Sequence, residues 1–178
     1  EQLAPKELIT EIDTCFRGID RIMDKYQIEK IKTIGDAYMA AGGLPKENLS
    51  HPIDVVLAAK EILLFIEELK TERIEKKLPY FDIRVGIHTG PLIAGIVGTK
   101  KFSYDIWGDT VNTASRMESS GEINKINISG ATYELIKEQF VCEYRGKVAA
   151  KNKGEIDMYF VKERIETIEN NHSITNSQ

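Results

Sequence analysis

The sequence predicts an α+β domain in which helices pack on a mostly antiparallel sheet. Residues 3–26 and 51–74 carry apolar side chains at three- and four-residue spacing, which is typical of long helices. Short apolar runs bounded by glycine-containing turns predict strands between and after these helices. Because the strands come in groups separated by helices, the pattern favours α+β over a regularly alternating parallel α/β sheet.

The size and charge of the chain exclude several classes of protein. Its 178 residues, of which 42% are hydrophobic, suffice for one domain with a sizeable core. The net charge of −4 argues against a dedicated nucleic-acid binder. Cys15 and Cys142 show no metal-ligand spacing, which predicts a reducing, cytoplasmic compartment. No apolar run reaches transmembrane length.

The N-terminal half predicts two helices with a hairpin between them. Residues 28–34 and 37–41 form the two strands around the turn signal Gly35-Asp36. The second helix has a broad apolar face and a charged end, EELKTERIEKK, which we interpret as solvated surface. The chain starts at Glu1 without Met and enters a helix almost at once, so we expect it to be a fragment of a larger protein.

The C-terminal half predicts shorter elements. Residues 81–88 alternate between apolar and polar side chains, which predicts a half-buried strand, and Thr89-Gly90-Pro91 predicts a turn into a returning strand at 92–97. A strand ending at Trp107 is followed by Gly108, by Asp109 at a predicted N-cap and by a helix over 110–117. We expect the later elements to be a strand at 126–128, a helix from Ser129 to Ile136, strands at 140–149 and 156–162, and a polar, disordered tail at 163–178.

The strongest functional signal lies between Lys101 and Met117. Asn112 and Arg116 are four residues apart, so the predicted helix places them on one face, and Asp105 lies just before the turn. An amide, a guanidinium and a carboxylate suit a ligand that carries both phosphate and hydrogen-bonding edges. The alternative is a solvated amphipathic helix, because polar helix starts with a good cap are common.

Other polar residues give weaker signals one by one. Asp36 lies at a hairpin tip, where carboxylates are usually structural or solvated, and Lys32 on the preceding strand is of a type that usually snorkels to water. Lys151 flanks a loop tip that equally fits a solvated turn. His51, His88 and His172 do not lie in a recognisable nucleophile motif, and we interpret all three as structural or surface residues.

Three segments together resemble the class III nucleotidyl cyclases, the adenylyl and guanylyl cyclase catalytic domains. They are IEKIKTIGDAYMAAGG (28–43), IRVGIHTGPLIAGIVG (83–98) and FSYDIWGDTVNTASRMES (102–119). The resemblance covers residues 1–162, which we expect to form one catalytic domain. It implies a ferredoxin-like α+β fold, a head-to-tail dimer with active sites across its interface, and conversion of a nucleoside triphosphate into a 3′,5′-cyclic monophosphate and pyrophosphate.

Carried over to this chain, the resemblance implies a role for each candidate residue. Lys32 and Asp105 resemble the pair that reads adenine, and guanylyl members typically have Glu and Cys there, so ATP is the expected substrate. Asp36 resembles the second of two aspartates that bind two Mg²⁺ or Mn²⁺ ions. The remaining matches are Asn112 to a residue that orients the ribose, Arg116 to one that stabilises charge on the phosphate, and Lys151 to one that grips the terminal phosphates.

One family feature has no counterpart in these residues. The first metal-binding aspartate belongs to a strand ahead of the first helix, in a segment resembling F-x-D-[IV]-x-G-F, which this sequence lacks. We therefore expect the fold without its first strand, an inactive or nearly inactive fragment, and an active homodimeric parent. In that dimer, one protomer supplies Asp36 and its partner the other site residues. A sensor or membrane region elsewhere in the parent is compatible with the sequence.

Other functions stay open at this point. A guanylate cyclase is one alternative, and a non-catalytic, nucleotide-binding regulatory module is another. A diguanylate cyclase shares a related fold, but the sequence has no GG-[DE]-EF motif.

Overall fold

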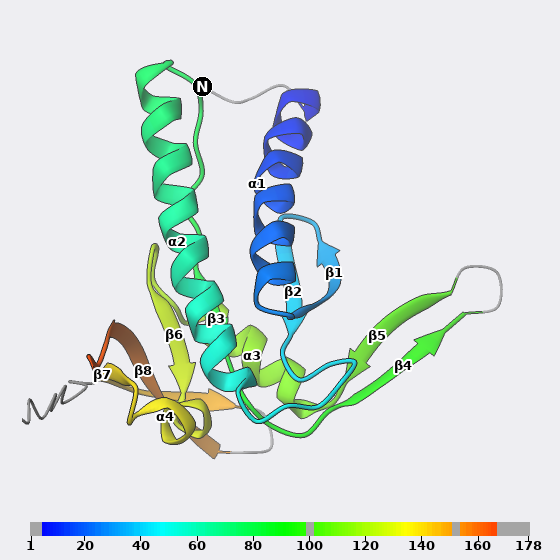
Figure 1. Cartoon of the computed structure of the whole chain (residues 1–178), viewed down its shortest axis with the longest axis vertical. Coiled ribbons are helices and arrows are strands. Elements are labelled where there is room, and N and C mark those ends of the chain that lie inside the picture. The colour runs from blue at the N-terminus through cyan, green and yellow to red at the C-terminus, as the bar shows by residue number, and fades with distance from the viewer. Residues whose placement is uncertain (1–4, 99–101, 151–153, 167–178) are drawn as a thin grey trace, which may run out of the picture.

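A computed structural model describes residues 5–98, 102–150 and 154–166 of the chain (Figure 1). The elements follow in the order α1 (Pro5–Lys25), β1 (Glu29–Ile34), β2 (Ala37–Ala41), α2 (His51–Glu75), β3 (Val85–Ile87), β4 (Ile93–Val97), β5 (Ser103–Trp107), α3 (Asp109–Ser119), β6 (Ile126–Ser129), α4 (Gly130–Ile136), β7 (Phe140–Ala150) and β8 (Gly154–Arg164).

The strands form three sheets in the described part of the chain. Strands β1 and β2 make an antiparallel hairpin, as do β4 and β5. The third sheet has the order β3-β6-β8-β7, in which only the pairing of β3 with β6 is parallel. The predicted α+β class with a mostly antiparallel arrangement is therefore confirmed.

The predicted hairpin of residues 81–88 with 92–97 is wrong. Hydrogen-bonded strand is limited to Val85–Ile87, which pairs in parallel with β6, whereas β4 pairs with β5 from Ile93↔Trp107 to Val97↔Ser103. The alternation in residues 81–87 does reflect alternating burial, since Ile83 is half-buried and Arg84 is exposed. Alternation reports which face of a strand is buried but not which strand lies beside it.

Helix α2 packs against two clusters of buried side chains and so joins the sheets. Val56 and Ala59 pack with β3, β6, α4 and β7, in a cluster that includes the fully buried Ile128 and Ile136. Residues from the neighbouring positions of α2, including Ala58 and Ile62, pack with α1, which lies beside α2 in Figure 1, and with the β1–β2 hairpin. Each large apolar side chain buried in this way contributes about 1.5–3 kcal/mol.

Several predicted boundaries also change. Asp109 is the first residue of α3 and Gly108 occupies the N-cap without a side-chain cap, so the predicted N-cap at Asp109 is wrong. Strand β8 continues through Arg164, two residues into the predicted tail, and the part of that tail at 167–178 lies outside the described residues. The helices in the described residues are all too short or too polar to cross a bilayer.

Candidate active site

Lys32 on β1 and Asp105 on β5 form an ion pair. The Lys32 Nζ donates to Asp105 Oδ2 at 2.6 Å, and Oδ1 of the same carboxylate accepts from the backbone N–H of Ile106 at 2.8 Å. The hydrogen bond from Lys32, followed by that from Ile106, holds the pKa of Asp105 below its usual range. The carboxylate is therefore an ionised hydrogen-bond acceptor at neutral pH.

A register shift in β1 separates this lysine from its neighbour. Lys30 pairs with Ala40 but Lys32 pairs with Met39, so one extra residue stands between them on β1. Lys30 bonds Asp20 of α1 at 2.8 Å, whereas Lys32 reaches β5. Because of this irregularity, two lysines of one short strand form ion pairs with different elements, Lys30 with α1 and Lys32 with β5.

Asn112 and Arg116 lie on the exposed face of α3, one turn apart. The opposite face of the helix carries Thr110, Thr113 and Met117, which are all buried. Gly108, with φ of 134°, turns the chain sharply from β5 into α3, a conformation that favours glycine. Asp105 thus lies just before this turn and Asn112 just after it.

The structure does not bring the remaining predicted residues into the same group. Asp36 is exposed in the turn between β1 and β2. Lys151 lies outside the described residues. No three His, Cys, Asp or Glu residues in the described ranges come close enough together to hold a metal ion, so Asp36 offers one carboxylate rather than a complete site.

Contacts with α3 involve residues that the sequence analysis did not single out. Thr110 Oγ1 donates to the carbonyl oxygen of Pro91 near the start of the helix. At its other end, Asn127 Nδ2 donates to Met117 O at 2.8 Å and Arg145 Nη1 donates to Ser120 O at 2.6 Å. Of these contacts, only that of Asn127 had a signal in the sequence, because a single asparagine stands within the otherwise apolar strand 126–128.

His88 and Ser129 form a close pair that is not a catalytic dyad. His88 Nδ1 lies 2.7 Å from Ser129 Oγ, at the adjacent ends of β3 and β6. Ser129 is fully buried, and its Oγ accepts from the N–H of Thr132 as the N-cap of α4. A hydroxyl committed to a cap and closed to solvent cannot meet a substrate, so Ser129 is not a nucleophile activated by His88.

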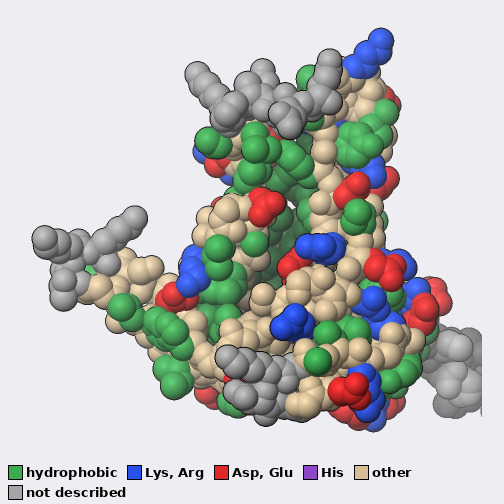
Figure 2. All heavy atoms as spheres, turned by 180° about the vertical axis from the view of Figure 1, so that it is seen from behind, with side chains coloured by type: hydrophobic (Ala, Val, Ile, Leu, Met, Phe, Trp, Pro, Cys, Tyr) green, Lys and Arg blue, Asp and Glu red, His purple; other side chains and the backbone are tan. Residues whose placement is uncertain are grey.

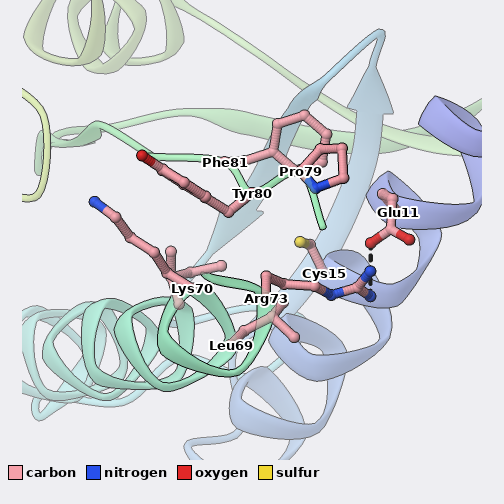
Figure 3. Close-up of a pocket in the computed structure, with 9 residues that line it drawn as sticks. Glu11, Cys15, Leu69, Lys70, Arg73, Pro79, Tyr80 and Phe81 are labelled. Atoms are coloured by element: carbon pink, nitrogen blue, oxygen red, sulfur yellow. Dashed lines mark ion pairs between the residues drawn. The ribbon is translucent and has the colours of Figure 1, made fainter. Parts of the chain in front are cut away.

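A pocket between α1, α2 and residues 79–81 is separate from these residues (Figure 3). Glu11 and Arg73 close it with an ion pair of 2.6 Å, and both side chains are mostly buried. Burial raises the pKa of the Cys15 thiol, which lies inside the pocket and is therefore protonated and weakly reactive. None of the predicted site residues lines this pocket.

The β4–β5 hairpin extends from the body of the molecule (Figure 1), and apolar side chains are exposed along it (Figure 2). They are Ile93, Ile96, Val97, Phe102 and, in part, Trp107. Ile96 is 70% exposed and Phe102 75%, which is unusual for residues of this size.

The family model of the adenylate and guanylate cyclase catalytic domain matches residues 1–163. The chain therefore belongs to the family of nucleotidyl cyclase catalytic domains, as the three sequence segments predicted. This membership makes it a cyclase domain of the type that forms cyclic nucleotides.

Relatives include cyclases for both purine nucleotides. The chain is 42% identical to guanylyl cyclase C of Homo sapiens over 161 residues, covering 88% of this chain and 15% of that protein. It is 36% identical to adenylate cyclase of Mycobacterium tuberculosis over 158 residues, covering 89% of this chain and 35% of that protein. The chain thus spans well under half the length of these relatives.

A solved structure agrees with the fold. The guanylate cyclase domain of RhGC from Catenaria anguillulae, in complex with GTP, superposes with a TM-score of 0.85 at 33% identity, covering 92% of this chain and 88% of that chain. The predicted cyclase fold is confirmed. The relatives include enzymes named for either nucleotide and so do not distinguish ATP from GTP as the substrate.

Proposed function

We propose that this domain converts ATP into 3′,5′-cyclic AMP and pyrophosphate. The observation that carries the proposal is the pairing of Lys32 with Asp105. A lysine can only donate and an ionised carboxylate can only accept. Adenine presents an acceptor at N1 beside a donor at N6, whereas guanine presents a donor at N1 beside an acceptor at O6. The pair therefore complements adenine and mismatches guanine.

Lys32 can donate a hydrogen bond to the base while it stays bonded to Asp105. An ammonium group has three donors, of which the carboxylate uses one. The Asp105 carboxylate likewise has further acceptor positions beyond those used by Lys32 and Ile106. The ion pair thus holds both groups in place before the nucleotide arrives, which reduces the cost of ordering them on binding.

The proposed reaction is an intramolecular displacement. The ribose 3′-oxygen forms a bond to the α-phosphorus, the bond from that phosphorus to the bridging oxygen breaks, pyrophosphate leaves, and the 3′-hydroxyl proton passes to solvent. Arg116 would stabilise the charge that develops on the phosphate oxygens, because its planar fork stays protonated and spans several of them. Asn112 would orient the ribose, and Lys151 would bind the terminal phosphates.

We further propose that Mg²⁺ or Mn²⁺ takes part, with Asp36 as one ligand. Such ions bind through one or two carboxylates together with substrate phosphates, so a single exposed carboxylate suits part of a site. The second carboxylate is expected from a strand that precedes α1. Among the described strands, β2 pairs only with β1 and β3 only with β6, which leaves each of them an edge for such a strand. Bound ions would neutralise phosphate charge and acidify the attacking hydroxyl.

The proposed assembly is a head-to-tail homodimer. The proposed location of the domain is the cytoplasm. The exposed apolar side chains of the β4–β5 hairpin support an interface with a second copy. Each site would combine Asp36 of one protomer with Lys32, Asp105, Asn112, Arg116 and Lys151 of the other. Both cysteines are free thiols, which fits a reducing compartment.

Exchange of the base-reading pair tests the proposal. In the full-length protein, Lys32→Glu with Asp105→Cys should move the preference of the enzyme from ATP toward GTP. An unchanged preference would count against the assignment of these two residues. Lys30→Glu is a matched control on the same strand, because Lys30 pairs with Asp20 rather than with β5.

Two other functions have some support. The 42% identity to guanylyl cyclase C favours a guanylate cyclase, which would turn over GTP in preference. The described residues contain no group of three or more His, Cys, Asp or Glu side chains that could hold a metal ion. This favours a nucleotide-binding regulatory module, which would bind ATP without forming a cyclic product in the full-length protein.

A further inference from the structure

We propose that Arg145 and Asn127 are positioning residues, which hold the last turn of α3 by its carbonyl groups and thereby fix Arg116. The inference rests on the proposed function, because it concerns the helix that carries Asn112 and Arg116. We call this pair of contacts the α3 clamp.

Asn127 is the first half of the α3 clamp. Its side chain is fully buried on β6, and its Nδ2 donates to the carbonyl oxygen of Met117, the residue after Arg116. Its Oδ1 is buried without a hydrogen-bond partner, which is unfavourable. An apolar residue would avoid that cost but would leave the Met117 carbonyl without this donor. The same Nδ2 also lies 3.5 Å from Met158 Sδ, a weak acceptor, so the bond to the Met117 carbonyl of α3 is the stronger contact that the asparagine adds.

The backbone of β3 at Gly86, beside Asn127, packs directly against the same turn of α3. Gly86 of β3 is the register partner of Asn127. A Cβ atom at Gly86 would lie only 2.0 Å from the backbone nitrogen of Glu118 and 2.4 Å from its Cα. The last turn of α3 thus rests directly on the β3 backbone, and small displacements of the helix meet hard contacts.

Arg145 is the second half of the α3 clamp. The register of β7 shifts between Tyr144 and Gly146, so Arg145 is the extra residue of a β-bulge, a device that redirects a side chain. Its guanidinium lies 4.1 Å from the centroid of the Phe160 ring, and its Nη1 donates to Ser120 O at 2.6 Å. The side chain is 18% exposed. A fixed cation at the C-terminal end of a helix also interacts favourably with the helix dipole.

The α3 clamp acts on the reaction through the position of Arg116. The carbonyl groups that it holds belong to Met117, the residue after Arg116, and to Ser120, the C-cap residue whose N–H bonds the carbonyl oxygen of Arg116. Because α3 has only 11 residues, a tilt at its last turn displaces the guanidinium of Arg116 directly.

Arg145→Gln in the full-length protein tests the α3 clamp. We expect kcat with ATP to fall about tenfold, because a displacement near 1 Å of a group that stabilises the transition state is costly. The KM for ATP should change less than twofold, because Lys32 and Asp105 lie on β1 and β5, which the clamp does not touch. Arg84→Gln is a matched control: it removes an exposed ion pair between Arg84 and Glu118 of the same helix turn, and should leave kcat unchanged.

A double-mutant cycle separates positioning from general damage. In an Arg116→Ala background, Arg145→Gln should lower the remaining kcat by less than twofold, since the group that it positions is gone. An equal tenfold loss in both backgrounds would overturn the positioning role. If Arg145→Gln does not fold, Arg145→Lys makes the same comparison, because it keeps the cation but not the planar fork.

Hydrogen exchange distinguishes failure of the α3 clamp from failure of the proposed reaction. The amides of Ser120 and Gly121, which bond Arg116 O and Glu118 O, should exchange at least several-fold faster in Arg145→Gln than in the unaltered protein. Unchanged exchange together with unchanged kcat would overturn the α3 clamp alone. Absence of any cyclic product from the unaltered full-length protein would overturn the proposed reaction, and with it the positioning role.

Discussion

Lys32 and Asp105 form a 2.6 Å ion pair although they stand on strands of two different hairpins. Their side chains are 39% and 19% exposed, and ion pairs at such positions usually add less than about 1 kcal/mol to stability. The ammonium group keeps two further donors, and the carboxylate keeps further acceptor positions. The proposed function uses these free positions to bind adenine.

Replacing Lys32 should damage substrate selection more than stability. We expect Lys32→Met to lower kcat/KM for ATP by about 10- to 100-fold, because a buried polar edge of the base loses its partner. The midpoint of thermal unfolding should barely move. Lys30→Met provides the control, since it removes a comparable exposed ion pair from the same strand. Equal losses of kcat/KM in the two variants would contradict a role specific to Lys32.

The state of Asp105 predicts how acid acts on the fold. Its pKa is lowered in the folded protein by the hydrogen bond from Lys32, so the stabilisation is present above the ordinary aspartate pKa of about 3.9 and is lost as the pH falls through the lower folded value. Urea unfolding of the unaltered protein and of Asp105→Asn should show a constant difference from pH 8 to pH 5. That difference should shrink toward pH 3, and a difference that grows in acid would contradict the ion pair.

Arg116 should matter for the rate and not for the fold. Because its side chain is exposed, Arg116→Ala should leave thermal unfolding within about 0.5 kcal/mol of the unaltered protein. Loss of one charge-stabilising donor typically lowers kcat about 10²–10³-fold, and we expect this range with ATP. Ser115→Ala changes an adjacent exposed position of the same helix and should have full activity. An Arg116→Ala enzyme of normal kcat would remove Arg116 from the site.

Local sequence patterns were sufficient for most of the fold. The long helices and the hairpin around Gly35-Asp36 follow from signals within a few residues, and all appear within two residues of their predicted bounds. The pairing of β3 with β6 could not be predicted from local patterns, because the two strands are about 40 residues apart in the sequence. The alternation of apolar and polar residues in a strand carries no information on which strand pairs with it. The N-cap of α3 is Gly108 and not the predicted Asp109, because the chain turns there with a φ of 134°, which favours glycine.

The candidate site was predictable only in part. The spacing of Asn112 and Arg116 on one helix face is a local property and could be read directly. The meeting of Lys32 with Asp105 depends on the arrangement of two hairpins, so only the family resemblance could predict it. Asn127 and Arg145 contact α3 through backbone carbonyl groups, which leave no trace in the sequence of the helix.

The β4–β5 hairpin should control association of two copies. Ile96→Asp places a charge among exposed apolar side chains, and we expect it to weaken the dimer of the full-length protein at least tenfold in sedimentation equilibrium. Leu64→Asp is the control, because Leu64 is 66% exposed on α2 and away from the hairpin. Equal association of Ile96→Asp and the unaltered protein would exclude this hairpin from the interface.

The most direct measurement compares cyclic AMP formation from ATP with cyclic GMP formation from GTP by the full-length protein, with Mn²⁺ present and with the 178-residue chain beside it. Recognition of adenine by Lys32 and Asp105 predicts that kcat/KM for ATP exceeds that for GTP by at least tenfold. The proposed metal site, to which this chain contributes Asp36 alone, predicts separately that the 178-residue chain makes little or no product. Preferential turnover of GTP would contradict that recognition, and ATP binding without any cyclic product would favour a regulatory module.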